Sequence, residues 1–118
     1  MNEPIVWIDV AAEAELIDAD VVAVPAMGRE IALYLVEGEV YATDNRCTHG
    51  DARLSEGFVI DHCIECPLHQ GQFDVRTGEP LCTPVTEPLR VWRVRREGGR
   101  ILVALDAPEG GAPSAPAA

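Results

Sequence analysis

The 118-residue chain contains no lysine, and all nine of its basic residues are arginine. It also has 20 acidic residues, which give a formal net charge of −11. A negative field of this size repels phosphate groups, so nucleic acids and anionic membrane surfaces are unfavourable partners. No apolar run approaches the roughly 18 residues that a membrane-spanning helix needs. The first residues also lack the basic and apolar regions of a signal peptide. We therefore expect a cytoplasmic protein that binds neither nucleic acid nor membrane.

Motifs for nucleotide-dependent chemistry are also missing. The chain has no G-x-G-x-x-G fingerprint for a flavin or nicotinamide cofactor, and no spare set of ligands for a mononuclear iron site. Its length corresponds to roughly one domain of about 150 residues or fewer. These absences favour a small protein without substrate chemistry of its own.

Short strands separated by glycine and proline turns dominate the hydrophobic pattern. The expected strands are residues 5–8 and 21–24, a hairpin of 31–36 with 40–43, and a hairpin of 89–95 with 101–105. The single helical candidate, Ala11 to Leu16, is too short to be stable alone. The pattern predicts an all-β fold, an antiparallel sandwich or barrel.

We expect a single domain over residues 1–106 and a flexible C-terminal tail over 107–118, which is rich in alanine, proline and glycine. The middle of the chain, about residues 44–84, contains all four cysteines and all three histidines. A β-scaffold that carries a binding site on loops is the simplest arrangement for such a sequence.

Two short segments contain the metal-binding pattern. They are Cys47-Thr48-His49-Gly50 and Cys66-Pro67-Leu68-His69, which give C-x-H, sixteen residues, and then C-x-x-H. Two thiolates and two imidazoles form a ligand set for a soft metal. Structural zinc sites usually take both cysteines from one knuckle and both histidines from the other. Here each segment supplies one of each, which suits a two-iron cluster better than zinc.

The stretches T-D-N-R-C-T-H-G and I-E-C-P-L-H-Q-G-Q-F-D-V-R-T-G resemble the cluster loops of Rieske proteins. The chain resembles the small Rieske ferredoxins of multicomponent aromatic-ring dioxygenases, such as those of the naphthalene dioxygenase type. The resemblance covers about residues 5–105. It implies a Rieske-type β-sandwich with a small cluster-binding subdomain on loops.

The resemblance also implies a Rieske 2Fe-2S cluster, with Cys47 and Cys66 on the inner iron and His49 and His69 on the outer iron. The implied function is electron transfer from a flavin-containing reductase to a terminal oxygenase, by a monomer that is not itself an enzyme. Two alternatives remain: a Rieske small subunit of another oxygenase or of a nitrite reductase, and a zinc-stabilised interaction module.

Several positions depart from the high-potential Rieske proteins. The disulfide cysteines of those proteins correspond to Ala52 and Leu68, and their hydroxyl donors correspond to Gly71 and Phe73. Each missing donor removes stabilisation of the reduced cluster, so we expect a potential near the low end of the Rieske range, roughly −150 mV. Gly71, like Gly50, is expected to have a positive φ where its loop turns. Thr83 to Val85 is expected to form a third loop over the cluster.

The remaining cysteine, histidine and tryptophan residues are expected to have structural roles and not to bind the cluster. Cys63 and Cys82 are expected to be small buried hydrophobic residues. His62 is expected at the surface rather than among the ligands. Trp7 and Trp92 are expected in the core.

Overall fold

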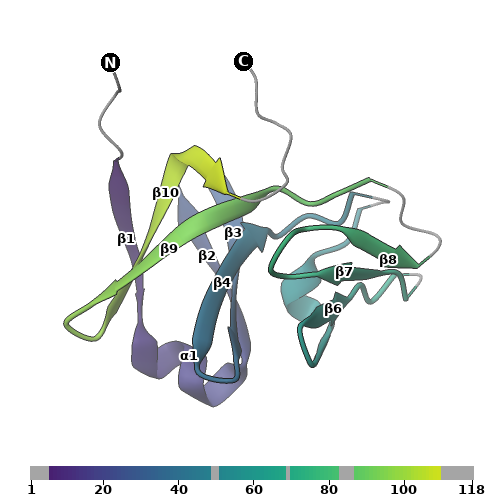
Figure 1. Cartoon of the computed structure of the whole chain (residues 1–118), viewed down its shortest axis with the longest axis horizontal. Helices are drawn as coiled ribbons and strands as arrows, with labels where there is room; N and C mark the ends of the chain where they lie inside the picture. Colours follow the sequence, from purple (N-terminus) through teal and green to yellow (C-terminus); the bar gives the residue numbers. More distant parts are fainter. Residues whose placement is uncertain (1–5, 49–50, 69, 83–86, 110–118) are drawn as a thin grey trace.

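The computed structural model describes residues 6–48, 51–68, 70–82 and 87–109. Within these ranges the chain forms ten β-strands, one α-helix and one 3₁₀ helix, and the strands make two antiparallel sheets (Figure 1). The all-β fold class expected from the sequence is therefore confirmed.

The larger sheet has six strands in the order β1-β10-β9-β4-β3-β2. These strands are β1 (Trp7–Ala12), β2 (Val21–Ala26), β3 (Arg29–Val36), β4 (Glu39–Asp44), β9 (Val91–Glu97) and β10 (Arg100–Glu109). Both expected hairpins are present, β3 with β4 and β9 with β10. In the first of them, Glu37 and Gly38 both have positive φ, which matches the twist of the flanking strands.

Strand β10 is longer than the sequence suggested. The expected strand ended at residue 105 and the expected tail began at 107, whereas β10 continues to Glu109. The register of β10 against β9 shifts between Ala104 and Pro108, and Pro108 is then opposite Trp92. Such a bulge lets pairing continue past an irregular stretch that contains proline.

The helix α1 (Glu13–Ala19) connects β1 to β2. It begins two residues later than the predicted Ala11, because Ala11 and Ala12 pair with Ile101 and Arg100 at the end of β1. Leu16 is fully buried beneath the large sheet, while most of the helix faces solvent. Packing of this leucine, rather than intrinsic propensity, explains how so short a helix persists.

Strand β3 is buried on both of its faces. Its sequence Ile31-Ala32-Leu33-Tyr34 is continuously apolar, and successive side chains point to opposite sides of the sheet. Ile31 and Leu33 belong to the core inside the large sheet, whereas Ala32 and Tyr34 belong to a second core that also contains Cys47. One strand thus connects the scaffold to the region of the cysteines.

The smaller sheet has the strand order β5-β6-β7-β8 and lies to one side of the large sheet (Figure 1). Its strands are β5 (Phe58–Ile60), β6 (Cys63–Glu65), β7 (Gln72–Asp74) and β8 (Pro80–Cys82), and the 3₁₀ helix η1 (Leu54–Glu56) precedes them. The sequence had predicted only loops here. Strands of three residues are too short to show the alternation by which a strand is recognised.

Candidate metal centre

The two cysteine-bearing loops are closed in the same way. The Cys47 N–H donates to the Ala52 carbonyl at 3.0 Å, and the Cys66 N–H donates to the Gly71 carbonyl at 2.8 Å. In both loops the acceptor is therefore the residue five positions after the cysteine.

The bases of the two loops also correspond. Arg46 bridges to Arg53 below the first loop, and Glu65 pairs with Gln72 below the second. The same offsets, one residue before the cysteine and six after it, apply to both pairs. Two segments of different sequence thus present one cysteine each in equivalent positions.

The Cys47 and Cys66 side chains are both buried and belong to the same core. The two thiols are close enough for each to affect the ionisation of the other. Burial raises the pKa of the Cys66 thiol to about 11; the Leu68 N–H, 3.5 Å from its Sγ, opposes the rise, and the Cys47 thiol adds to it. Without a metal the Cys66 thiol therefore keeps its proton at neutral pH, and a bound cation must displace it.

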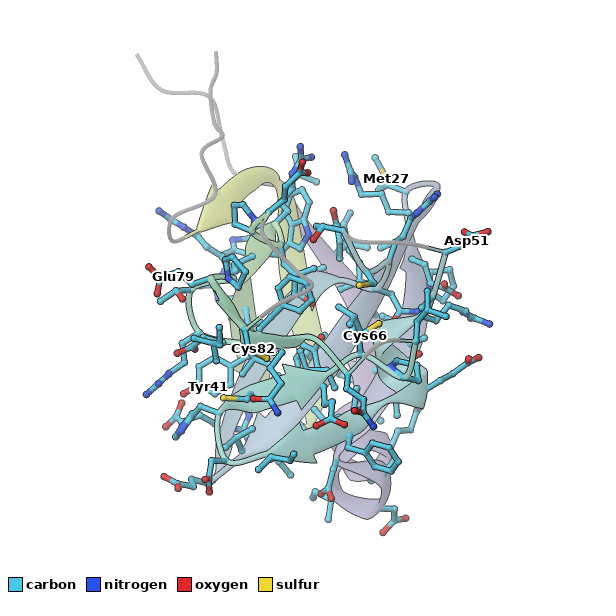
Figure 2. All side chains as sticks on the ribbon, turned by 90° about the vertical axis from the view of Figure 1, so that its right-hand side faces the viewer. Met27, Tyr41, Asp51, Cys66, Glu79 and Cys82 are labelled. Atoms are coloured by element: carbon cyan, nitrogen blue, oxygen red, sulfur yellow. The ribbon has the colours of Figure 1, made fainter. Side chains whose placement is uncertain are left out.

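An apolar floor lies beneath the two cysteines. Leu54, Ile64 and Phe73 are fully buried and pack in the same core as both thiols. This floor excludes water from one side of the loops and lowers the local dielectric. The other side belongs to the end of the molecule that faces the viewer in Figure 2, where Cys66 lies near the middle.

Gly57 lies directly against the second loop, a contact that sequence analysis did not identify. A Cβ added at this glycine would be 1.9 Å from the Glu65 carbonyl oxygen and 3.1 Å from Pro67 Cδ. The φ of Gly57 is −95°, so the glycine is needed for space and not for its backbone conformation. A glycine directly after a short 3₁₀ turn carries no sequence signal for such a contact.

Three other expectations fall on residues that the structure does not describe. His49 and His69 lie outside the described ranges, as do Gly50 and the segment 83–85. The structure therefore brings together two of the four expected ligands, Cys47 and Cys66.

Two expectations about neighbouring residues are wrong. Cys82 is exposed rather than buried, because it lies on the edge strand β8, and Cys63 is only partly buried. In the second loop, positive φ occurs at Gln70 (φ 64°), one residue before the expected Gly71. The turn closes there because the Gln70 N–H donates to the Cys66 carbonyl at 3.1 Å.

His62 is partly buried and packs against Tyr41. Its ring meets Tyr41 edge to face, with centroids 5.9 Å apart. Trp92 is buried as expected, and its indole N–H donates to Asp44 at 3.0 Å. Trp7 is only half-buried.

An open cleft of about 460 Å³ lies beside the first loop. Arginines and acidic residues line it in equal number: Arg29, Arg46, Arg53, Glu30, Asp44 and Asp51. Charges on this side of the loops are therefore balanced, in contrast to the net charge of −11 of the whole chain.

The residues present fit an iron–sulfur cluster. Two soft donors are buried side by side on equivalent loops, which suits iron–sulfur chemistry and not a hard cation such as magnesium or calcium. Elsewhere in the described ranges, no group of three or more histidine, cysteine or acidic side chains is placed to hold a metal ion. None of the helices described is long and apolar enough to cross a membrane.

Comparison with known proteins agrees with an iron–sulfur site. The Rieske [2Fe-2S] domain matches residues 6–93. The ferredoxin component of the naphthalene 1,2-dioxygenase system of Pseudomonas aeruginosa is 54% identical over 99 residues, which cover 84% of this chain and 95% of the relative.

Two solved structures extend the comparison. The ferredoxin of carbazole 1,9a-dioxygenase from Nocardioides aromaticivorans IC177 aligns with a TM-score of 0.79 and 38% identity, covering 83% of this chain and 96% of the other. A chain from a complex of reduced oxygenase and oxidized ferredoxin in carbazole 1,9a-dioxygenase aligns with a TM-score of 0.78 and 39% identity, covering 86% and 94%.

Proposed function

Because this chain belongs to the Rieske [2Fe-2S] domain family, we propose that it is the ferredoxin of an aromatic-ring dioxygenase system. It carries single electrons to a terminal oxygenase and is not itself an enzyme. Its similarity to dioxygenase ferredoxins over 84% of its length is the observation that carries this function. A zinc-stabilised interaction module is not compatible with this family membership.

Cys47 and Cys66 hold the inner iron, and His49 and His69 hold the outer iron. The equivalent loops support this assignment, because each delivers a buried thiol to the same place. In the sequence, each histidine follows its cysteine by only two or three residues, which supports ligation by both residues of each segment. When bound, the cluster supplies a centre that accepts and releases one electron.

The surrounding residues keep the thiol side dry and leave the opposite side accessible. Leu54, Ile64 and Phe73 close off the interior, whereas Leu68 is 43% exposed and its neighbour Pro67 is also exposed. An electron carrier must release its partners quickly, which favours a contact smaller than about 1,200 Å². The exposed apolar end of the second loop suits such a contact.

The partners are a terminal oxygenase and an NAD(P)H-dependent flavin reductase, which bind in turn to this end of a cytoplasmic monomer. A solved relative that aligns with this chain comes from a complex of oxygenase and ferredoxin, which supports the oxygenase partner. Because one exposed end serves both reactions, the chain binds the two partners alternately. The oxygenase, rather than the ferredoxin, selects the aromatic substrate.

Reconstitution with purified components tests this function. Reductase, NAD(P)H, the cluster-loaded chain and the oxygenase are mixed, and electron arrival at the oxygenase is followed by stopped-flow absorbance. We expect transfer to require the chain and to be lost with Cys66→Ser, while Cys63→Ser, a matched cysteine outside the ligand set, transfers normally. Equal transfer without the chain, or in Cys66→Ser, would contradict the proposal.

A further inference from the structure

A polar network lies at the base of the first loop, two residues before Cys47. Asn45 is fully buried, and both ends of its side-chain amide are used. Its Nδ2 donates to Glu30 Oε1 at 3.0 Å, and its Oδ1 accepts the Ser55 N–H at 2.8 Å. A buried amide satisfied on both sides fixes its surroundings, because breaking either bond leaves an unpaired polar group in the core.

The backbone of Asn45 makes the same two connections. Its N–H donates to the Glu30 carbonyl at 3.0 Å, and its carbonyl accepts the Leu54 N–H at 2.7 Å. Asn45 therefore joins the start of β3 to η1 through both its side chain and its main chain.

The Glu30 carboxylate also binds the residue that follows the loop. Arg53 donates from Nε to Oε1 at 3.1 Å and from Nη2 to Oε2, so the two groups form a bidentate pair. Arg53 comes directly after Ala52, whose carbonyl accepts the Cys47 N–H. The Glu30 carboxylate on β3 thus accepts hydrogen bonds from both ends of the first loop, from Asn45 before the loop and from Arg53 after it.

The second loop is held differently. Its ends continue into the paired strands β6 and β7, and the Gln72 amide donates to Glu65 at 3.1 Å across them. Below the first loop only an isolated bridge, between Arg46 and Arg53, is described. The first loop therefore depends on contacts with β3 for the rigidity that the second obtains from its hairpin.

We propose that Glu30, Asn45 and Arg53 are positioning residues for the first ligand loop, and we call them the Glu30 clamp. The clamp rests on the proposed function, because its purpose is to hold Cys47 opposite Cys66 in the geometry that the cluster requires. None of the three side chains is an expected ligand. Charge-assisted hydrogen bonds to a carboxylate are among the stronger ones in proteins, which suits a clamp on a loop without a strand ladder.

The rate at which the chain loses its cluster tests the clamp, and this rate can be measured without any electron-transfer partner. The loaded chain is exposed to an iron chelator, and the loss of visible absorbance is timed. We expect Asn45→Ala and Arg53→Leu to release iron about tenfold faster, the lower end of the effect of removing residues that support metal ligands. Arg100→Leu is the matched control, because the Arg100–Asp9 pair is also bidentate and similarly exposed. The exposed side-chain fractions are 50% for Arg100 and 48% for Asp9, compared with 52% for Arg53 and 45% for Glu30.

Hydrogen exchange of the same variants separates positioning from general destabilisation. In Asn45→Ala, amides of residues 45–54 should exchange faster, while those of residues 64–74 and of β9–β10 keep their protection. Glu30→Gln keeps an acceptor for the Asn45 amide and should therefore release iron more slowly than Glu30→Ala. This pair of variants replaces Asn45→Ala if Asn45→Ala does not fold.

Two results would overturn the clamp: release rates equal to that of Arg100→Leu, or faster exchange spread evenly over the chain. Either result would leave the electron-carrier function intact, because that function is measured separately by electron arrival at the oxygenase. Conversely, if the unaltered chain retains its cluster but transfers no electrons to the oxygenase, the proposed function is refuted and the clamp is unaffected.

Discussion

At the scale of single residues, Gly71 and Phe73 occupy the positions that correspond to the hydroxyl donors of high-potential Rieske proteins. Neither side chain has a hydroxyl group, and Phe73 is fully buried in the same core as Cys47 and Cys66. Hydrogen bonds to sulfur favour the reduced, more negative cluster, so we expect the lack of these two hydroxyl donors to lower the reduction potential, even though the Leu68 N–H donates to Cys66 Sγ.

Adding the two hydroxyl groups should raise the potential. We expect Gly71→Ser with Phe73→Tyr to have a midpoint potential higher by tens of millivolts, well within the wide range that Rieske centres span. Redox titration followed by visible circular dichroism measures the change, with the single variants as controls. An unchanged potential in the double variant would show that burial, and not hydrogen bonding, sets its value.

Some of the residues at the site could be identified from the sequence, and others could not. Cys47 and Cys66 belong to the local patterns C-x-H and C-x-x-H, which can be read directly from the sequence, and the structure buries both cysteines in one core. The contact of Asn45 with Glu30 joins residues fifteen positions apart, and neither has a distinctive neighbour. Such partners become visible only when the fold places them together.

At the scale of elements, the short strands β5 to β8 position the second loop, although no sequence pattern revealed them. Three-residue strands have no readable period, and their stability comes from inward side chains such as Val59, Ile64 and Phe73. The hairpins of the large sheet were predictable because they are longer and have a glycine turn, as in β3–β4.

The close packing of η1 on the second loop makes Gly57 intolerant of a side chain. We expect Gly57→Ala to destabilise the chain by about 1–3 kcal/mol, the usual cost of overpacking, and to speed iron release. Chemical denaturation and chelator challenge measure the two effects. Gly38→Ala has open space but a positive φ, so it should cost stability without changing iron release. Equal retention in the two variants would contradict this.

The turn after β7 should make stability depend on pH. The bidentate hydrogen bonds from Arg76 are the main reason that the pKa of the Asp74 carboxyl lies below its ordinary 3.8, although burial opposes the shift. Because the folded pKa is the lower one, this stabilisation is complete above about pH 5 and is lost as the pH falls through the lowered value.

Urea midpoints at several pH values test this turn. Asp74→Asn should unfold at lower urea than the natural chain at pH 7, and the difference should shrink as the pH falls below 3.8. Asp18→Asn, on the exposed side of α1, is the control. A difference that stays constant to the lowest pH would assign the effect to packing instead of charge.

At the scale of the whole molecule, a net charge of −11 surrounds a proposed docking end that is itself largely uncharged. Figure 2 shows Asp51 and Glu79 on opposite sides of Cys66; Asp51 is paired with Arg46 at 3.5 Å, so the negative field comes from the whole chain and not from this residue. The end itself carries the uncharged residues Pro67, Leu68 and Gln70, all exposed. An apolar contact within a negative field favours approach to a basic surface of the partner.

A charge at the apolar end should therefore impair both partner reactions. We expect Leu68→Glu to slow electron transfer from the reductase and to the oxygenase, and we expect transfer by the natural chain to slow as salt rises to physiological strength. Ile17→Glu is the control, because Ile17 is also exposed and apolar but lies on α1. Unchanged rates for both partners in Leu68→Glu would require a different site of electron exit.

Pulsed EPR of the reduced chain, produced with isotopically labelled histidine, tests the proposed cluster ligation most directly. Two imidazole nitrogens should couple to the unpaired electron. Because the chain has three histidines, His62→Ala should keep both couplings, whereas His49→Ala or His69→Ala should abolish the Rieske-type signal. A reduced iron–sulfur signal without nitrogen coupling, or an unchanged signal in His49→Ala or His69→Ala, would contradict ligation by Cys47, Cys66, His49 and His69.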